Sequence, residues 1–116
     1  MKELNKKLAE WAGFIFDEGA EYGIPPILGL WYAPDNNQIG YPELPQFTQS
    51  LDACFKWLVP KVVGGDSYTV DIRTEKYQTW VHLIAHYYMD KSYDTQDKEP
   101  ALALCLAIEK LIDGEK

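Results

Sequence analysis

Two β-strands joined by a turn are predicted by residues 67–88, whose sequence is SYTVDIRTEKYQTWVHLIAHYY. Over 67–73, apolar and polar residues alternate with the period of two that marks a half-buried strand. Glu75 and Lys76 supply the turn, and 79–88 forms the second strand. A helix over 79–88 is the alternative, because this segment is apolar at most positions. We favour the strand because β-branched and aromatic residues dominate it and a hairpin partner directly precedes it.

Three helices are predicted around this hairpin. Segment 2–12 carries apolar residues with the i, i+4, i+7 spacing of an amphipathic helix. Ser50 is the expected N-cap of a second helix, which Pro60 ends. A third helix begins at Pro100 and ends at Gly114. This order predicts one α+β domain over 1–116, a layered α/β/α sandwich with about three helices and a small, mainly antiparallel sheet.

Two connecting segments lack such periodicity. Segment 23–45 holds five of the seven prolines, which excludes a regular helix across most of it, although 27–32 is compatible with a short strand. Segment 90–98 is rich in charged residues, and we expect a solvated loop there. Long irregular segments that carry aromatic residues are often functional, so 23–45 is a candidate for function.

The balance of charge excludes some partners. The chain of 116 residues has 11 Lys plus Arg and 18 Asp plus Glu, which gives a net charge of -7. Nonspecific binding to nucleic acid or to an anionic membrane needs a cationic surface, so this balance argues against both. The sequence has no apolar run near the ~20 residues of a membrane span and does not begin like a secretory signal. We expect a soluble, cytoplasmic protein.

Cys54 and Cys105 each lie inside an apolar helical pattern. In a cytosolic protein, a cysteine so placed is more often a small buried hydrophobe than half of a disulfide. We therefore predict two reduced thiols in the core, and a single bridge between them is the alternative.

Three long segments carry a resemblance to a known family. They are 45–61 (PQFTQSLDACFKWLVPK), 99–113 (EPALALCLAIEKLID) and 7–14 (KLAEWAGF). Together with the strands between the first two segments, they cover most of the chain. In these segments the chain resembles the phage ABA sandwich domain family. Segment 17–44 is the part that least resembles that family.

The resemblance implies a small phage or prophage protein with an α/β/α layered fold. It implies no known chemistry, because that family is largely of unknown function. No site residue carries over, since the matching segments consist of capping and core positions. By analogy, small accessory phage proteins often act against host defences, some by binding a host protein and others by sequestering a signalling nucleotide.

The sequence contains no signature of an enzyme. It has no Gly-x-Ser-x-Gly elbow, and Gly64-Gly65-Asp66 lacks the Lys-Ser/Thr that completes a phosphate loop. His82 and His86 would present two ligands to one metal ion on a helix, but on a strand they lie ~13 Å apart. We therefore predict a non-enzymatic protein that uses no metal or cofactor.

One face of the second predicted strand carries Trp80, His82 and His86, and it is too aromatic to be left in water. A covering helix layer is one interpretation, and a ligand pocket is the other. In a pocket, aromatic rings stack on a base and histidines donate to phosphate or ribose oxygens. Arg73, the single arginine of the chain, is either an anion anchor for that pocket or the ion-pair partner of a nearby carboxylate.

Trp31 and Tyr32, with Tyr41, give segment 23–45 its aromatic character. These rings either pin the segment to the core or form an exposed surface. Two hypotheses follow. In the first, the protein sequesters a nucleotide-type immune signal at a site drawn from Arg73, Trp80, His82, His86, Trp31 and Tyr32. In the second, it is an interaction module that inhibits a host defence protein through an acidic aromatic surface.

Leu102 and Leu106 lie almost opposite the core stripe of the last helix. A helix that is apolar on two sides is usually covered on both. We expect these two leucines to contact a second subunit of a homo-oligomer, and a central position of the helix between two layers is the alternative. An oligomer would also repeat each cationic side chain around a shared pocket.

Overall fold

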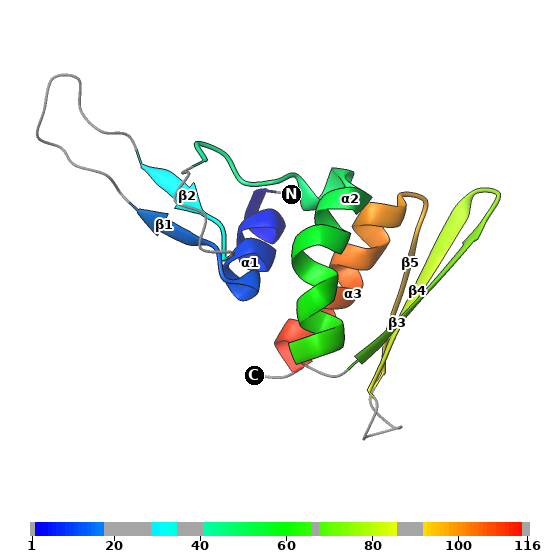
Figure 1. Ribbon diagram of the computed structural model, residues 1–116. Coiled ribbons are helices and arrows are strands. Elements are labelled where there is room, and N and C mark those ends of the chain that lie inside the picture. Colours follow the sequence, from blue (N-terminus) through cyan, green and yellow to red (C-terminus); the bar gives the residue numbers. More distant parts are fainter. Residues whose placement is uncertain (1, 18–28, 35–40, 66–67, 86–91, 115–116) are drawn as a thin grey trace, which may run out of the picture.

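The computed structural model describes residues 2–17, 29–34, 41–65, 68–85 and 92–114 (Figure 1). It has an α+β architecture, with helices packed on an antiparallel sheet, and this confirms the predicted α+β class with about three helices and mainly antiparallel pairing. In chain order the elements are α1 (Lys2–Ala12), β1 (Ile15–Asp17), β2 (Leu30–Tyr32), η1 (Phe47–Gln49), α2 (Leu51–Ala53), η2 (Cys54–Leu58), η3 (Lys61–Gly65), β3 (Tyr68–Glu75), β4 (Gln78–Ala85), β5 (Ser92–Asp97) and α3 (Pro100–Gly114).

The larger sheet is an antiparallel meander in the order β3-β4-β5. On the central strand β4, the buried side chains alternate with more exposed ones, so Val81 and Leu83 face inward while Trp80 and His82 face outward. This pattern confirms the predicted strand as far as Ala85. The last part of the prediction, 86–88, lies outside the described residues.

The helices gather on the inner face of this sheet (Figure 1). Helix α3 packs on β4 and β5, η3 packs beside β3, and α1 packs against α3 and η2. The described elements are thus layered as α1, then the other helices, then the sheet. Within the described ranges no helix covers the outer face of the sheet, and none of the helices there is long and apolar enough to cross a membrane.

A single cluster of buried side chains joins these layers. It draws on α1, on the helical segment 51–65, on β4 and on α3. The largest side chains that are completely buried are Phe47, Leu8, Leu58, Leu83, Leu104, Ile108, Leu111, Val62 and Val81. Because the cluster takes its members from both ends of the chain, folding brings α1 and α3 together around residues of the middle.

Strand β5 corrects the prediction of a solvated loop over 90–98. Residues Ser92–Asp97 pair with β4 along their whole length, with Tyr93 opposite Leu83 and Thr95 opposite Val81. Tyr93 and Thr95 are half-buried, and the Thr95 hydroxyl donates to the carbonyl of Ala103 at 2.6 Å. The solvent-side residues Ser92, Asp94 and Gln96 are polar, but Thr95 and Asp97 on the inward side are polar too, so the sequence shows no clear apolar alternation. The strand is stabilised by its pairing with β4.

The second helix also departs from the prediction, because Pro60 does not end it. Ser50 caps the segment as expected, since its Oγ accepts from the backbone N–H of Ala53 at 3.2 Å. The helical path then continues in wide π-type turns to Gly65. In π-type turns the backbone hydrogen bonds span five residues, as from Val59 N–H to the carbonyl of Cys54. Burial of Val62 holds the extended part of the helix against the core.

The two-stranded sheet β1-β2 stands at the opposite end of the molecule from β3, β4 and β5 (Figure 1). Phe16 lies opposite Trp31 in this pairing, and their rings are 5.0 Å apart between centroids. Trp31 also exchanges two backbone hydrogen bonds of 2.8 Å with Tyr41. The predicted short strand in 27–32 is therefore confirmed over Leu30–Tyr32.

The register of β4 is tested by Leu83→Ala and Ile84→Ala. Leu83 is fully buried, so its truncation should lower the free energy of unfolding by roughly 2–5 kcal/mol through lost burial and the cavity left behind. The neighbouring Ile84 is 39% exposed on the outer face, so Ile84→Ala should lower the free energy of unfolding by less than about 1 kcal/mol. Urea unfolding followed by circular dichroism measures both. Equal losses, or a larger loss for Ile84→Ala, would contradict the register.

Candidate functional site

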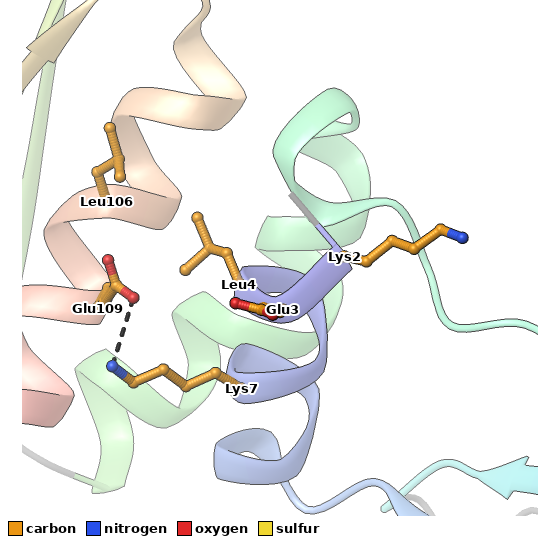
Figure 2. Close-up of a pocket in the computed structure, with 6 residues that line it drawn as sticks. All are labelled: Lys2, Glu3, Leu4, Lys7, Leu106 and Glu109. Atoms are coloured by element: carbon orange, nitrogen blue, oxygen red, sulfur yellow. Dashed lines mark hydrogen bonds and ion pairs between the residues drawn. The ribbon is translucent and has the colours of Figure 1, made fainter.

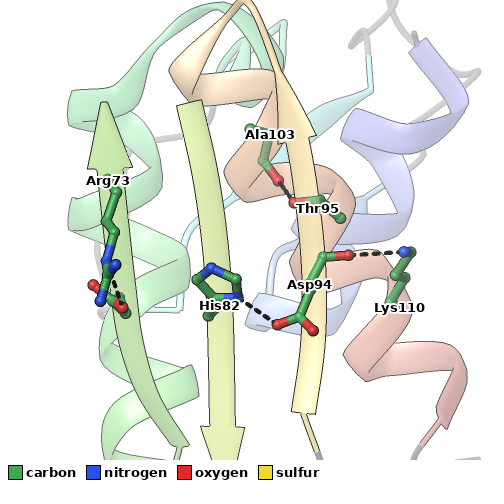
Figure 3. Close-up of polar contacts among 7 residues, drawn as sticks. Arg73, His82, Asp94, Thr95, Ala103 and Lys110 are labelled. Atoms are coloured by element: carbon green, nitrogen blue, oxygen red, sulfur yellow. Dashed lines mark hydrogen bonds and ion pairs between the residues drawn. The ribbon is translucent and has the colours of Figure 1, made fainter. Parts of the chain in front are cut away.

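The outer face of the three-stranded sheet brings together several of the residues singled out in the sequence. Arg73 of β3 lies opposite Trp80 of β4, and in the next row Asp71, His82 and Asp94 lie side by side on β3, β4 and β5. Figure 3 shows Arg73, His82 and Asp94 on these three neighbouring strands. This grouping follows from the alternation of side chains along paired strands.

Arg73 and His82 on this face each have an acidic partner. The Arg73 Nε atom lies 3.5 Å from Asp71 Oδ2, although the arginine side chain remains 74% exposed. His82 Nδ1 lies 2.6 Å from Asp94 Oδ1, which fixes the orientation of the imidazole ring. The expectation of a carboxylate partner for Arg73 is thus met by Asp71, and the pair stays accessible to solvent.

A shallow hollow of about 330 Å³ lies over β4 and β5 on this side of the molecule. Lys110 reaches its rim from α3, and its Nζ donates to the backbone carbonyl of Asp94 at 2.8 Å (Figure 3). The residues that line the hollow are Trp80, His82, Asp94, Thr95, Gln96 and Lys110. Arg73 is outside this lining, one strand away from it.

The chemistry of the hollow suits a flat, polar ligand. The half-buried indole of Trp80 offers a ring face, Gln96 offers an amide, and Lys110 offers a positive charge. Few convergent polar groups around an aromatic wall are typical of small-molecule sites, and the volume is near the lower end of their range. Lys110 was not singled out from the sequence, because only the packing of α3 on β5 brings it here.

The other aromatic residues expected at this site lie elsewhere. Trp31 and Tyr32 are on β2, at the other end of the molecule, so they share no hollow with Trp80 (Figure 1). His86 lies outside the described residues, so its predicted place beside His82 stays a prediction. Among the residues that the structure describes, no three His, Cys, Asp or Glu side chains form a group that could hold a metal ion.

The end of the molecule formed by β1 and β2 exposes apolar side chains. Ile15 is 69% exposed, Phe16 is 47% exposed and Tyr41 is 40% exposed. With Trp31, Ile15 and Phe16 line a hollow of about 570 Å³. No role was predicted for Ile15 and Phe16, because an apolar run in a short strand does not distinguish a buried face from an exposed one.

A hollow of about 750 Å³ lies between α1 and α3 and is a weaker candidate for a ligand site. Figure 2 shows Leu4 and Leu106 near each other there, with Lys7 directed to Glu109. Lys7 Nζ lies 2.7 Å from Asp113 Oδ1 and 3.3 Å from Glu109 Oε2, so the ammonium group is already paired. Its hydrogen bond to Asp113 raises the pKa of Lys7 above the ordinary value.

Leu102 and Leu106 are half-buried and pack against the core cluster. Leu106 lines the hollow between α1 and α3, where Leu4 of the same chain is its neighbour (Figure 2). Helix α1 thus provides part of the cover that was expected from a second subunit. A homo-oligomer formed through these two leucines stays a prediction.

Cys54 and Cys105 are both free and fully buried, as predicted. The Cys54 thiol donates to the carbonyl of Phe47 at 3.1 Å, and the two sulfur atoms lie 3.6 Å apart. With the Cys54 proton directed at Phe47, Cys105 is the donor of the contact between the two sulfurs. This hydrogen bond, together with burial, raises the pKa of Cys105 far above the ordinary value. A thiol held in this way is a poor nucleophile.

Comparison with protein-family models, with curated proteins and with solved structures finds no match to this chain. The resemblance to the phage ABA sandwich domain family therefore stays a prediction.

Alkylation of the native protein tests the assignment of the two thiols. At neutral pH, iodoacetamide should leave both Cys54 and Cys105 unmodified over the time in which it fully modifies the protein unfolded in guanidinium chloride, because both thiols are completely buried. Mass spectrometry counts the added groups. Rapid addition to the folded protein would show that the cysteine pair is reachable and reactive, contrary to its place in the core.

Proposed function

We propose that this chain is a non-enzymatic binding protein that takes a small ligand with a planar ring and an anionic group, of nucleotide type, on the outer face of the three-stranded sheet. One observation carries the proposal: the indole of Trp80, the imidazole of His82 and the ammonium of Lys110 line one hollow. These groups complement the ring, the polar edge and the anion of such a ligand.

Trp80 is the platform for the ring. It is half-buried on the central strand, flanked by Arg73 on one neighbouring strand and by Gln96 on the other. The strands fix its position, so little side-chain entropy is lost when a ligand stacks on it. Stacking of a base on an aromatic side chain contributes ~1–3 kcal/mol per base.

The anionic group of the ligand is attracted by the nearby positive charge of Lys110, although the chain as a whole has a net charge of -7. The Lys110 ammonium contacts a neutral backbone carbonyl, so this hydrogen bond leaves its charge uncancelled. The Asp94 carboxylate is engaged by His82, which reduces its repulsion of an incoming anion. Close to the hollow, the Lys110 ammonium therefore provides a positive charge that the net charge of the chain does not reveal.

The resemblance to phage proteins supports a specific form of this function. A small accessory protein that binds a nucleotide-type immune signal of the host would lower the free concentration of that signal. Such a role needs binding and no turnover, and in the described residues the buried cysteines offer no accessible nucleophile. Sequestration of an immune nucleotide is therefore the physiological role that we propose.

Replacement of the ring platform tests the site. Binding of adenosine monophosphate should weaken by roughly 5- to 100-fold in Trp80→Ala, the equivalent of losing one stacked base. Trp31→Ala is the matched control, because Trp31 is also a half-buried strand tryptophan but lies on the other sheet. Isothermal titration calorimetry measures the dissociation constants.

Comparison of adenosine with adenosine monophosphate, which differ only in the phosphate, separates the role of the ring from that of the anionic group. Adenosine should bind the wild type and Lys110→Ala equally, whereas adenosine monophosphate should bind Lys110→Ala several-fold more weakly. Lys98→Ala, also at an exposed lysine, is the control for loss of one charge. Equal binding by Trp80→Ala, Trp31→Ala and the wild type would contradict the site, and absence of binding to any nucleotide probe would contradict the ligand class.

A second candidate function is favoured by the exposed aromatic surface of β1 and β2. We propose, as the alternative, that this surface inhibits a host defence protein by direct contact. Ile15, Phe16 and Tyr41 expose apolar area there, and the carboxylates of Asp17 and Glu43 lie close to them in the sequence, at exposed positions. Apolar patches rimmed by charge are typical of protein-binding surfaces.

Capture from a host lysate distinguishes the alternative. Under the second function, Phe16→Asp should lose a captured host protein, because a charge replaces an apolar contact at the centre of the interface. Tyr77→Asp is the matched control, since Tyr77 is 76% exposed in the turn between β3 and β4. Loss of the same protein in both variants, or in neither, would contradict a role for the β1-β2 surface.

A further inference from the structure

Strand β3 is paired along one edge and has no strand on the other within the described part of the chain. It pairs with β4 from Tyr68 to Glu75, and the sheet order is β3-β4-β5. Because alternate residues of an antiparallel strand direct their N–H and C=O groups to opposite edges, Val70–Thr74 present hydrogen-bonding groups on the side away from β4.

An apolar groove of about 430 Å³ runs beside this edge. Its floor is formed by Phe55, Val59 and Val63 of the helical segment and by Val70 and Ile72 of β3. Phe55 and Val63 are each 47% exposed, and Val70 and Ile72 are only half-buried although they lie on the inner face of the sheet. The inner face is thus incompletely covered at this edge.

We infer that the β3 edge and this groove bind an extended strand of a partner protein, as a fourth strand of the sheet. The edge requires a partner with free backbone groups, which an extended segment has and a helix does not. In an added strand every second side chain points to the inner face, where apolar side chains would cover the exposed parts of Phe55 and Val63.

The side chains of β3 define the charge pattern of that strand. On the outer face, Asp71, Arg73 and Glu75 follow one another at alternate positions, and the first two are 38% and 74% exposed. Directly opposite cross-strand positions favour opposite charges. An antiparallel partner should therefore carry basic, acidic and basic residues opposite Glu75, Arg73 and Asp71, with apolar residues between them.

This inference does not depend on the hollow over β4 and β5, whose lining residues belong to β4, β5 and α3. A peptide probe represents the strand: acetyl-KVEIKV-amide places lysines opposite Glu75 and Asp71, glutamate opposite Arg73 and apolar residues over the groove. The charge-reversed peptide acetyl-EVKIEV-amide has the same apolar residues and is its control.

Amide NMR spectra of the isotope-labelled full chain, titrated with each peptide, test the inference. The first peptide should shift the amide signals of Val70–Thr74 and bind at least about threefold more tightly than the reversed one, as expected from several cross-strand pairs. The triple variant Asp71→Lys, Arg73→Glu and Glu75→Lys should reverse this preference. All three side chains face the outer surface, so the fold should be kept, which the dispersion of the spectrum shows.

Phe55→Lys should abolish binding of the first peptide, because it places a charge in the groove. Phe16→Lys is the matched control, since Phe16 is also 47% exposed but lies in β1. Three results would overturn the inference: no shift in Val70–Thr74, no reversal of preference in the triple variant, or equal binding by Phe55→Lys and the wild type. Self-association that shifts the same amides without peptide would also overturn it, since the occupant would then be a second copy.

Discussion

Burial of the inner face of β4 against α3 is the constraint on which the rest of the structure depends. Val81 and Leu83 on the strand and Leu104 and Ile108 on the helix are all completely buried in one cluster. At ~1.5–3 kcal/mol for each fully buried aliphatic side chain, these four residues supply a large share of the marginal stability of a small domain. A slip of β4 by one residue would turn the buried side chains of Val81, Leu83 and Ala85 to the outer face, so the register is strongly determined.

The same constraint determines where function can lie. Once Val81 and Leu83 face the helices, Trp80 and His82 must face outward, and the described helices all pack on the inner side. The outer face therefore carries side chains that do not contribute to the core, among them the His82–Asp94 pair and the ring of Trp80. Residues without a packing role on a rigid sheet are well placed for recognition, because the strands hold them in position.

Much of the sheet was predictable from the sequence, and most of the site was not. The period-two pattern of 67–73 and 79–85 placed Trp80 and His82 on one face correctly, since alternation is a local property. Strand β5 was missed because its residues are polar on both faces except Tyr93, and its stability comes from pairing with β4. Lys110 was missed, and Trp31 was grouped with Trp80, because only long-range packing decides which elements meet.

If the Trp80 face holds a small anionic ligand with a planar ring, the protein should carry that ligand when it is isolated from cells. Native mass spectrometry of the protein taken directly from the cells that produce it, compared with the same sample after denaturation, tests this most directly. We expect a mass above that of the chain or of a whole-number oligomer. The excess should equal the mass of a nucleotide, should be lost on denaturation, and should be absent from Trp80→Ala. A wild-type protein that carries no small molecule and captures none from a nucleotide extract would contradict it.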